Sequence, residues 1–363
     1  MSLLEVSDLR VSFSTADGVV KAVRGVSFGV DTGRTLGIVG ESGSGKTVLT
    51  QTLLGLAPGG QVSGQAMFNG TDLLTLRPDQ LRKVRGAEIA VIFQDPLTSL
   101  HPLYKVGWQI REMIRSHDRS VTRAQARERS VELLARVGIP NPRQRVDDYP
   151  HQFSGGMRQR AMIAMALSLT PKLIIADEPT TALDATVQAQ ILDLLIRLQQ
   201  ESDTALIMIT HDLGVVADIA DDVLVMYAGR AAETADKHDI FYRPHHPYTK
   251  GLLESIPNSS VAGERLKPIT GQPPSLINLP SGCAFHPRCA YVMDRCLTEE
   301  PSLTAVGAAG EHRSACFLPV QAAGNAAEAE AIRVRAVGQG RHDAAAKVAE
   351  AIASAPESEG SVI

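Results

Sequence analysis

The sequence has 363 residues, of which 44% are hydrophobic, and its formal net charge is −4. It is long enough for one large domain with an appendage, or for two domains, and it can bury a sizeable core. The negative charge argues against a general nucleic-acid binder. No stretch is apolar over the roughly 18 residues of a membrane-spanning helix, and the polar N-terminus lacks the apolar centre of a signal peptide, so we expect a cytoplasmic protein.

The predicted elements alternate between strands and helices. Short strand patterns at 3–13, 19–30, 35–40 and 64–70 predict an antiparallel layer beside one central strand. The pattern is helical from about 107 to 170, where the segment 121–138 ends before a Gly-Ile-Pro stop. Strand patterns return at 172–178 and 205–210, separated by a helical pattern at 185–202. This order predicts an α/β fold with a mostly parallel sheet covered by helices.

Composition divides the chain into three parts. Residues 1–240 carry the alternating pattern, with a helical subdomain at about 100–170. Residues 241–320 are richer in proline and contain all four cysteines, so we expect a small C-terminal lobe there. Residues 321–363 lack aromatic side chains and are rich in Ala, Gly and Glu, which predicts a disordered tail.

Residues 40–47, GESGSGKT, have the spacing of a phosphate-binding P-loop between a strand and a helix. The glycines allow the backbone N–H groups from Ser42 to Thr47 to point inward around an anion, and the helix adds its positive N-terminal end. We expect Lys46 to reach the β- and γ-phosphates and Thr47 to bind Mg²⁺. The predicted ATP-binding residues of this loop are Gly40, Glu41, Ser42, Gly43, Ser44, Gly45, Lys46 and Thr47.

Two carboxylates end the apolar run LIIADE at 173–178. Asp177 and Glu178 would lie at the carboxyl edge of the sheet, beside the P-loop. We expect Asp177 to join the Mg²⁺ shell, directly or through water, and Glu178 to polarise the water that attacks the γ-phosphate. Such an acidic pair is a weak signal by itself, but together with the P-loop it indicates nucleotide hydrolysis.

The segment 153–167, FSGGMRQRAMIAMAL, contains a second predicted anion-binding turn at the start of a helix. A chain with one P-loop has little use for two such turns in one site, so Ser154, Gly155 and Gly156 would cover a nucleotide held by another subunit. With this signature the chain resembles the ATPase subunit of an ABC transporter.

The resemblance assigns further site residues in the expected order. Gln94, in IFQDP, would contact Mg²⁺ and the attacking water, and His211, in ITHD, would reach the γ-phosphate. Asp184, in TALD, would lie at the dimer interface. Phe13 would stack on the adenine, although an ordinary strand aromatic is the alternative. The catalytic residues are therefore Glu178, His211 and Gln94.

The signature departs from the usual pattern at its flanks. Phe153 and Met157 replace the usual leucine and glutamine, and we expect only a tuning effect because the serine–glycine–glycine turn is intact. The resemblance implies a composite site that needs a second ATPase subunit, expected to form a heterodimer.

The C-terminal segments 243–257 and 269–296 resemble the peptide/nickel importer branch of this family. The branch implies two transmembrane permease subunits, an extracytoplasmic binding protein and a peripheral location at the cytoplasmic face of the membrane. Di- and oligopeptides are the expected cargo, nickel or another small solute is the alternative, and a non-transport ABC ATPase is a distant one. We interpret His245 and His246 as structural. The segment 95–110 would either receive a permease or pack within the helical subdomain.

Cys283, Cys289, Cys296 and Cys316 fall within 34 residues, with gaps of five, six and nineteen. These gaps match neither a paired zinc ribbon nor a thioredoxin-like dithiol. Four cysteinates can hold a 4Fe–4S cluster, as the resemblance to peptide importers also suggests. Structural zinc and reduced structural cysteines remain the alternatives.

Overall fold

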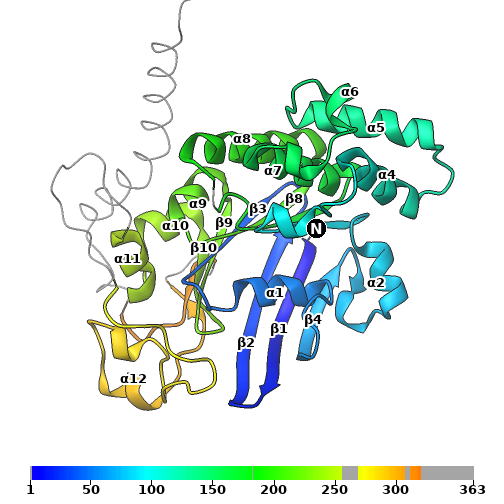
Figure 1. Ribbon diagram of the computed structural model, residues 1–363. Coiled ribbons are helices and arrows are strands. Elements are labelled where there is room, and N and C mark those ends of the chain that lie inside the picture. The colour runs from blue at the N-terminus through cyan, green and yellow to red at the C-terminus, as the bar shows by residue number, and fades with distance from the viewer. Residues whose placement is uncertain (1, 182, 256–268, 307–310, 320–363) are drawn as a thin grey trace, which may run out of the picture.

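The computed structural model describes residues 2–181, 183–255, 269–306 and 311–319 (Figure 1). Its strands form a four-stranded sheet and an eight-stranded sheet. The strands are β1 (Ser2–Thr15), β2 (Gly18–Asp31), β3 (Thr35–Val39), β4 (Gln61–Phe68), β5 (Thr71–Asp72), β6 (Ile89–Ile92), β7 (Leu173–Asp177), β8 (Ala205–Thr210), β9 (Asp222–Tyr227), β10 (Arg230–Asp236), β11 (Thr304–Ala305) and β12 (Arg313–Ser314). The predicted tail at 321–363 lies outside the described residues.

The smaller sheet is the predicted antiparallel layer, with strand order β2-β1-β4-β5. In β1 and β2 many alternate residues are buried, as expected for a sheet with one face on a core. The register pairs Phe13 with Val20 near one end of the long β1–β2 hairpin. This pairing brings Phe13 next to the strand that borders the P-loop.

The larger sheet has the order β11-β12-β10-β9-β3-β8-β7-β6. Strands β9, β3, β8, β7 and β6 run parallel, and β10, β12 and β11 add antiparallel pairs. Strands β3, β7 and β8 are buried along their whole length, as expected for parallel strands covered on both faces. The carboxyl ends of β3, β7 and β8 therefore lie side by side, and each leads into a predicted site segment.

Helices cover both faces of this sheet (Figure 1). The α-helices are α1 (Lys46–Leu53), α2 (Pro78–Val84), α3 (Pro96–Ser99), α4 (Val106–His117), α5 (Arg123–Arg136), α6 (Pro142–Arg145), α7 (Gly155–Ala166), α8 (Ala185–Ser202), α9 (Leu213–Ile219), α10 (Lys237–Tyr242), α11 (Pro247–Glu254) and α12 (Asp294–Thr298). The 3₁₀ turns in the described residues are η1 (Leu73–Thr75), η2 (Pro150–Gln152), η3 (Leu167–Leu169) and η4 (His286–Arg288). In the described ranges, no helix combines the length and apolar character needed to cross a bilayer.

The helical subdomain comprises α4 to α7, at the upper right of Figure 1. Helix α5 begins with a capping box, in which the Thr122 hydroxyl accepts from the Gln125 N–H. Its buried residues include Ala126, Val131 and Leu134, which recur at helical spacing and join a core shared with α7 and α8. Phe153 is buried in the same core. This departure from the usual signature pattern therefore packs inside the subdomain.

The segment 95–110 divides between the two alternatives considered from the sequence. Leu100 and Val106 are buried in the helical subdomain. Leu103 is 78% exposed, and Trp108, stacked on Tyr104, is 38% exposed. Local packing therefore accounts for some of its apolar residues but leaves an aromatic and aliphatic surface beside them.

The C-terminal lobe, drawn in yellow and orange in Figure 1, extends the main sheet through β11 and β12. Its Phe285 joins an apolar core that also contains Tyr227 and Tyr248. A fully buried carboxylate, Glu233 on β10, accepts hydrogen bonds from the His245 and His246 N–H groups and from the His312 ring. The two adjacent histidines are thus placed by their backbone, which agrees with the structural interpretation.

Glu233→Ala should lower the free energy of unfolding by about 3 kcal/mol or more, because it leaves three buried donors without their acceptor. Denaturant titration would measure the loss. Glu299→Ala is the matched control, since Glu299 is 55% exposed and pairs only with Arg295 at the surface of the lobe. The control should change stability by less than about 1 kcal/mol. Equal stability of the two variants would show that Glu233 does not tie the lobe to the sheet.

Candidate active site

The P-loop lies between the end of β3 and the start of α1. Gly45 caps α1 with φ of 100°, and Gly43 has φ of 77°, conformations that favour glycine. A side chain on Gly45 would collide with the Ala22 carbonyl of β2, and one on Gly40 would collide with the Met226 carbonyl of β9. The loop therefore packs against neighbouring backbone on one side and leaves Gly43 facing open space.

Lys46 is 5% exposed and donates to the Gly40 carbonyl at 2.7 Å and the Glu41 carbonyl at 3.0 Å. Burial lowers the pKa of this ammonium group, against the opposing influence of Glu178, Asp177 and Glu41. The loop carbonyls thus hold the ammonium at the phosphate-binding turn, where an anion would compensate its desolvation.

Thr47 and Asp177 meet across the site from α1 and β7. The Thr47 hydroxyl donates to Asp177 Oδ1 at 3.1 Å. Burial raises the pKa of Asp177, and the Thr47 hydrogen bond opposes this shift. A buried carboxylate beside a hydroxyl supplies the hard oxygen donors that Mg²⁺ prefers, so these two residues fit the ion.

Glu178 is the centre of the remaining polar contacts. Its φ of 46° turns the chain sharply after β7. Glu178 Oε2 accepts from Gln94 Nε2 at 3.1 Å and from the Thr181 hydroxyl at 2.9 Å, and Oε1 lies 3.3 Å from His211 Nδ1. The three predicted catalytic residues, which are far apart in sequence, are therefore in direct contact.

A cavity of about 720 Å³ opens in front of the P-loop. Its size is typical of small-molecule sites. It is lined by Phe13, Val20, Ala22, Glu41, Ser42, Gly43, Gly45, Lys46, Thr47, Val48, Gln94, Glu178, His211 and Leu276. The predicted adenine-side aromatic, the phosphate loop and the catalytic cluster thus share one cavity.

Three predicted nucleotide residues do not line it. Within the loop, Gly40 and Ser44 face away from the cavity, and the Ser44 carbonyl accepts from the Gly229 N–H at 3.0 Å. Asp177 lies next to the cavity and accepts from the hydroxyl of Thr47, which lines it. These three residues therefore contact the residues that line the cavity without lining it themselves.

Within the described residues, the predicted signature 154–156 and Asp184 also do not line the cavity. Ser154 instead caps α7, its hydroxyl accepting from the Met157 N–H, and Asp184 caps α8 through the Thr186 and Val187 N–H groups. Both turns stand at helix N-termini away from the chain's own P-loop.

Sequence reasoning missed several contacts of the site. Thr181 binds Glu178, and Leu276 of the C-terminal lobe lines the cavity. Glu41 lines the cavity, but both oxygens of its carboxylate form an ion pair with Arg288, at 2.6 and 2.9 Å. The sequence shows only an arginine in a proline-rich segment, and neither its burial nor its pairing with Glu41 carries a local signal.

The four cysteines of the C-terminal lobe form no disulfide with one another. Burial, with smaller contributions from the other three thiols, raises the pKa of Cys316 to about 11. Burial also raises the pKa of Cys283 and of Cys289. The Cys283 N–H donates to the Cys296 carbonyl, and Cys289 Sγ accepts from the Tyr291 N–H at 3.3 Å. The predicted set is thus brought into one neighbourhood.

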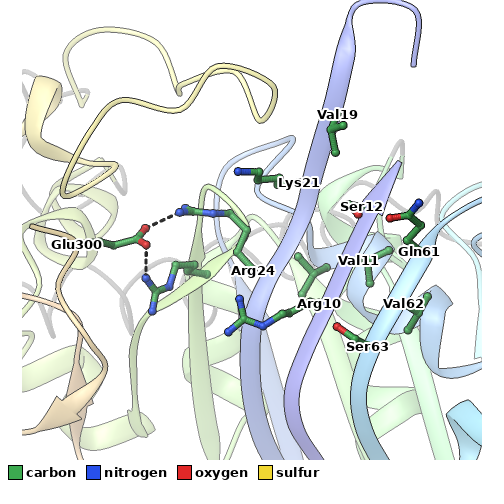
Figure 2. A pocket seen from close by; sticks show the side chains of 12 residues that line it. Arg10, Val11, Ser12, Val19, Lys21, Arg24, Gln61, Val62, Ser63 and Glu300 are labelled. Carbon is green, nitrogen blue, oxygen red and sulfur yellow. Dashed lines mark hydrogen bonds and ion pairs between the residues drawn. The ribbon is translucent and has the colours of Figure 1, made fainter. Parts of the chain in front are cut away.

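A second cavity of about 730 Å³ lies over β1, β2 and β4 (Figure 2). Its lining takes Val19 and Lys21 from β2, whereas the nucleotide cavity takes Val20 and Ala22, so the two cavities lie on opposite faces of this strand. Glu300 bridges Arg24 and Arg230 at its edge. It lacks the glycine loop and carboxylate cluster that carry the chemistry of the first cavity.

The fold and the nucleotide cavity define an ABC-type P-loop ATPase. Residues 23–181 match the family model of the ABC transporter, and residues 232–296 match that of the oligopeptide/dipeptide transporter C-terminal region. The dimeric, ADP- and phosphate-bound ATP-binding cassette MJ0796 has a similar fold, with a TM-score of 0.58 at 24% identity, covering 64% of this chain and 98% of that one.

The chain belongs to the ABC transporter ATPases, in the group with the C-terminal oligopeptide/dipeptide region. It is 52% identical over 321 residues to the oligopeptide transport ATP-binding protein OppD of Escherichia coli, covering 88% of this chain and 94% of the relative. It is 48% identical over 326 residues to the dipeptide transport ATP-binding protein DppD of the same organism, covering 89% and 99%. The chain is therefore an ATP-hydrolysing subunit.

Glu178→Gln should keep nucleotide binding but lower ATP turnover by roughly 10²-fold or more, because the amide preserves the shape of the cluster and loses the base. Steady-state phosphate release and nucleotide titration would separate the two effects. Glu88→Gln is the matched control, since Glu88 is 41% exposed and pairs with Lys172 at the other end of β7. Near-normal turnover in Glu178→Gln would remove this carboxylate from the chemical step.

Proposed function

We propose that this chain energises the import of di- and oligopeptides through an ABC transporter, at the cytoplasmic face of the cell membrane. The observation that carries the proposal is the near full-length similarity to oligopeptide and dipeptide transport ATP-binding proteins, at about half identity. The match of residues 232–296 to the oligopeptide/dipeptide C-terminal region supports the same branch.

In this role the residues of the cavity divide the reaction between them. Lys46 and the loop N–H groups bind the phosphates. Thr47, Gln94 and Asp177 would hold Mg²⁺, which would neutralise the negative charge of the phosphates. Glu178 orients and polarises the attacking water, and His211, within reach of the same carboxylate, contacts the γ-phosphate. Phe13 stacks on the adenine.

The site is composite in the proposed mechanism. The cavity holds the P-loop and the catalytic cluster of this chain, but not its segment 154–156 or Asp184. Ser154, Gly155 and Gly156, at the N-terminus of the twelve-residue helix α7, serve the nucleotide of a second ATPase subunit instead. One P-loop per chain then requires a dimer, here proposed as a heterodimer.

The proposed partners also include two transmembrane permease subunits and an extracytoplasmic substrate-binding protein. The exposed side chains of Leu103, Tyr104 and Trp108 on the helical subdomain support a docking surface for a permease. Nickel or another small solute remains the alternative cargo, because an ATPase subunit does not contact the transported molecule. The binding protein and the permeases choose it.

The isolated chain should be a poor ATPase, since its segment 154–156 belongs over another subunit's nucleotide. Adding the partner ATPase and permeases in lipid vesicles should raise turnover, and peptide-loaded binding protein should raise it further and drive peptide uptake. Stimulation and uptake with nickel in place of peptide would replace the proposed cargo. Robust hydrolysis by a demonstrably monomeric chain would contradict the composite site.

We further propose that Cys283, Cys289, Cys296 and Cys316 hold a structural 4Fe–4S cluster, with Zn²⁺ as the alternative. The other three cysteines contribute to the raised pKa of Cys316, which supports one shared site. The Tyr291 N–H donates to the sulfur of Cys289, as backbone donors around such clusters do. Thiolates around a single zinc ion at about 2.3 Å lie within roughly 4 Å of one another.

The cysteine sulfurs are not gathered as closely as a single zinc ion requires. In the described ranges, one group of three possible metal ligands has its ligand atoms within 4.8 Å of one another, and it consists of Asp236, His238 and Asp239. No three of the cysteine sulfurs are therefore that close together. A four-iron cluster separates its thiolates more widely than one ion does. The cluster would join the short loops of the lobe and has no part in ATP hydrolysis.

Anaerobically purified protein should be brown and contain about four irons per chain, with an absorption shoulder near roughly 400 nm. Cys289→Ser should lose most of the iron, whereas His238→Ala, in the exposed acidic group on α10, should keep it. Colourless protein with one zinc per chain would decide for the alternative. Metal-free folded protein with four free thiols would end both.

A further inference from the structure

Arg288 is a buried cation of the C-terminal lobe that the reaction does not use. Its side chain is 3% exposed although the lobe is small and loop-rich. It ends the 3₁₀ turn η4, whose backbone is fixed by hydrogen bonds from the Arg288 N–H to Phe285 and from the Cys289 N–H to His286. The backbone position of Arg288 within the lobe is therefore fixed.

The guanidinium group of Arg288 contacts the P-loop. Arg288 Nη1 and Nη2 donate to Glu41 Oε2 and Oε1 at 2.6 and 2.9 Å, a bidentate pair across 247 positions of sequence. The Nε–H donates to the Thr270 carbonyl at 3.0 Å, and the second donors of Nη1 and Nη2 bind the Tyr227 hydroxyl at 3.3 Å and the Ile269 carbonyl at 3.5 Å. The guanidinium is thus saturated with partners, and its fork geometry fixes both oxygens of Glu41.

Glu41 uses every polar group it has to connect the lobe with the catalytic lysine. Its carboxylate binds Arg288, and its N–H donates to the buried Tyr248 hydroxyl at 2.8 Å. Its carbonyl accepts from Lys46 Nζ at 3.0 Å. A shift of Glu41 would therefore displace the ammonium group that meets the phosphates.

A second ionic contact holds the lobe in register with the same loop. Glu300 pairs with Arg24 of β2, as Figure 2 shows, and with Arg230 of β10, each at 2.6 Å. The Arg24 N–H donates to the Gly229 carbonyl, and the Gly229 N–H donates to the Ser44 carbonyl of the P-loop. The lobe thus contacts the surroundings of the loop at two separate points.

Stability alone is a poor explanation for such a pair. Burying an ion pair costs desolvation that its attraction roughly offsets, so apolar residues in its place are often as stable. A bidentate pair instead defines a position. Here the defined position is that of the first residues of the phosphate loop.

We propose that Arg288 is a positioning residue of the nucleotide site, which fixes Glu41 and thereby holds the P-loop and Lys46 in the arrangement that binds ATP. The lobe then sets the affinity for nucleotide. This inference rests on ATP binding and does not depend on which solute is transported.

The test is nucleotide titration of the full chain, in the absence of any cargo, for Arg288→Met, Glu41→Gln and the double variant. If the loop occupies its binding arrangement about a tenth of the time without the pair, each single variant raises the Kd for ATP about tenfold. The double variant should lose no more than either single variant, because both remove the same contact. Arg288→Lys should recover part of the affinity.

Two further readouts separate positioning from folding. In the assembled transporter, both single variants should raise KM and leave kcat at saturating ATP within about twofold, because a saturating ligand restores the loop. By reciprocity, ATP should slow amide hydrogen exchange of residues 283–297 in the native chain and not in Arg288→Met. Arg295→Met is the matched control, an exposed arginine of the same lobe paired with Glu299.

Unchanged ATP affinity in folded Glu41→Gln would overturn the proposal, and this variant changes no residue of the lobe should Arg288→Met fail to fold. Additive losses in the double variant would also overturn it, since the two residues would then act separately. Loss of kcat with unchanged KM would move Arg288 out of nucleotide binding.

Discussion

The backbone of the P-loop has to leave its N–H groups free for phosphate while its other polar groups are satisfied by the protein. A loop that wrapped around an anion site without outside support would be both strained and mobile. Here three sets of contacts hold the loop, one from within it and two from outside. Lys46 donates to two loop carbonyls, Gly229 donates to Ser44, and the C-terminal lobe holds Glu41. The rest of the site is arranged around a loop fixed in this way.

The parallel sheet brings the chemistry to that loop. Strands β3 and β7 lie on either side of β8, so the P-loop, Glu178 and His211 leave the same edge of the sheet. The sharp turn at Glu178 brings its carboxylate within hydrogen-bonding distance of Gln94 and Thr181. The antiparallel layer supplies the opposite wall through Phe13. No single element could place these groups together, which explains why the cluster is spread over more than a hundred positions of the chain.

Much of this arrangement was predictable because it depends on local patterns. The P-loop, the strands before Asp177 and His211, and helix α8 at 185–202 follow from glycine spacing and hydrophobic periodicity, and the structure has them where predicted. The position of Glu178 followed from the strand before it, the roles of Gln94 and His211 followed from the resemblance, and the contacts of these two residues with Glu178 were not predicted. The Arg288–Glu41 pair could not be predicted, because it joins positions 247 apart and depends on how the lobe packs. The extension of the main sheet by β11 and β12 could not be predicted either, because strands of two residues are too short to show an alternating hydrophobic pattern.

The account rests on one nucleotide held by this chain's own loop, with Lys46 contacting the phosphates. Calorimetric titration of the full chain with Mg-ATP tests it most directly, using Lys46→Ala and, as control, Lys172→Ala, a lysine that is 50% exposed and paired with Glu88. The account predicts one ATP per chain, magnesium-dependent affinity, and binding lost in Lys46→Ala but retained in the control. Unimpaired binding by Lys46→Ala, or no binding by the native chain, would contradict it.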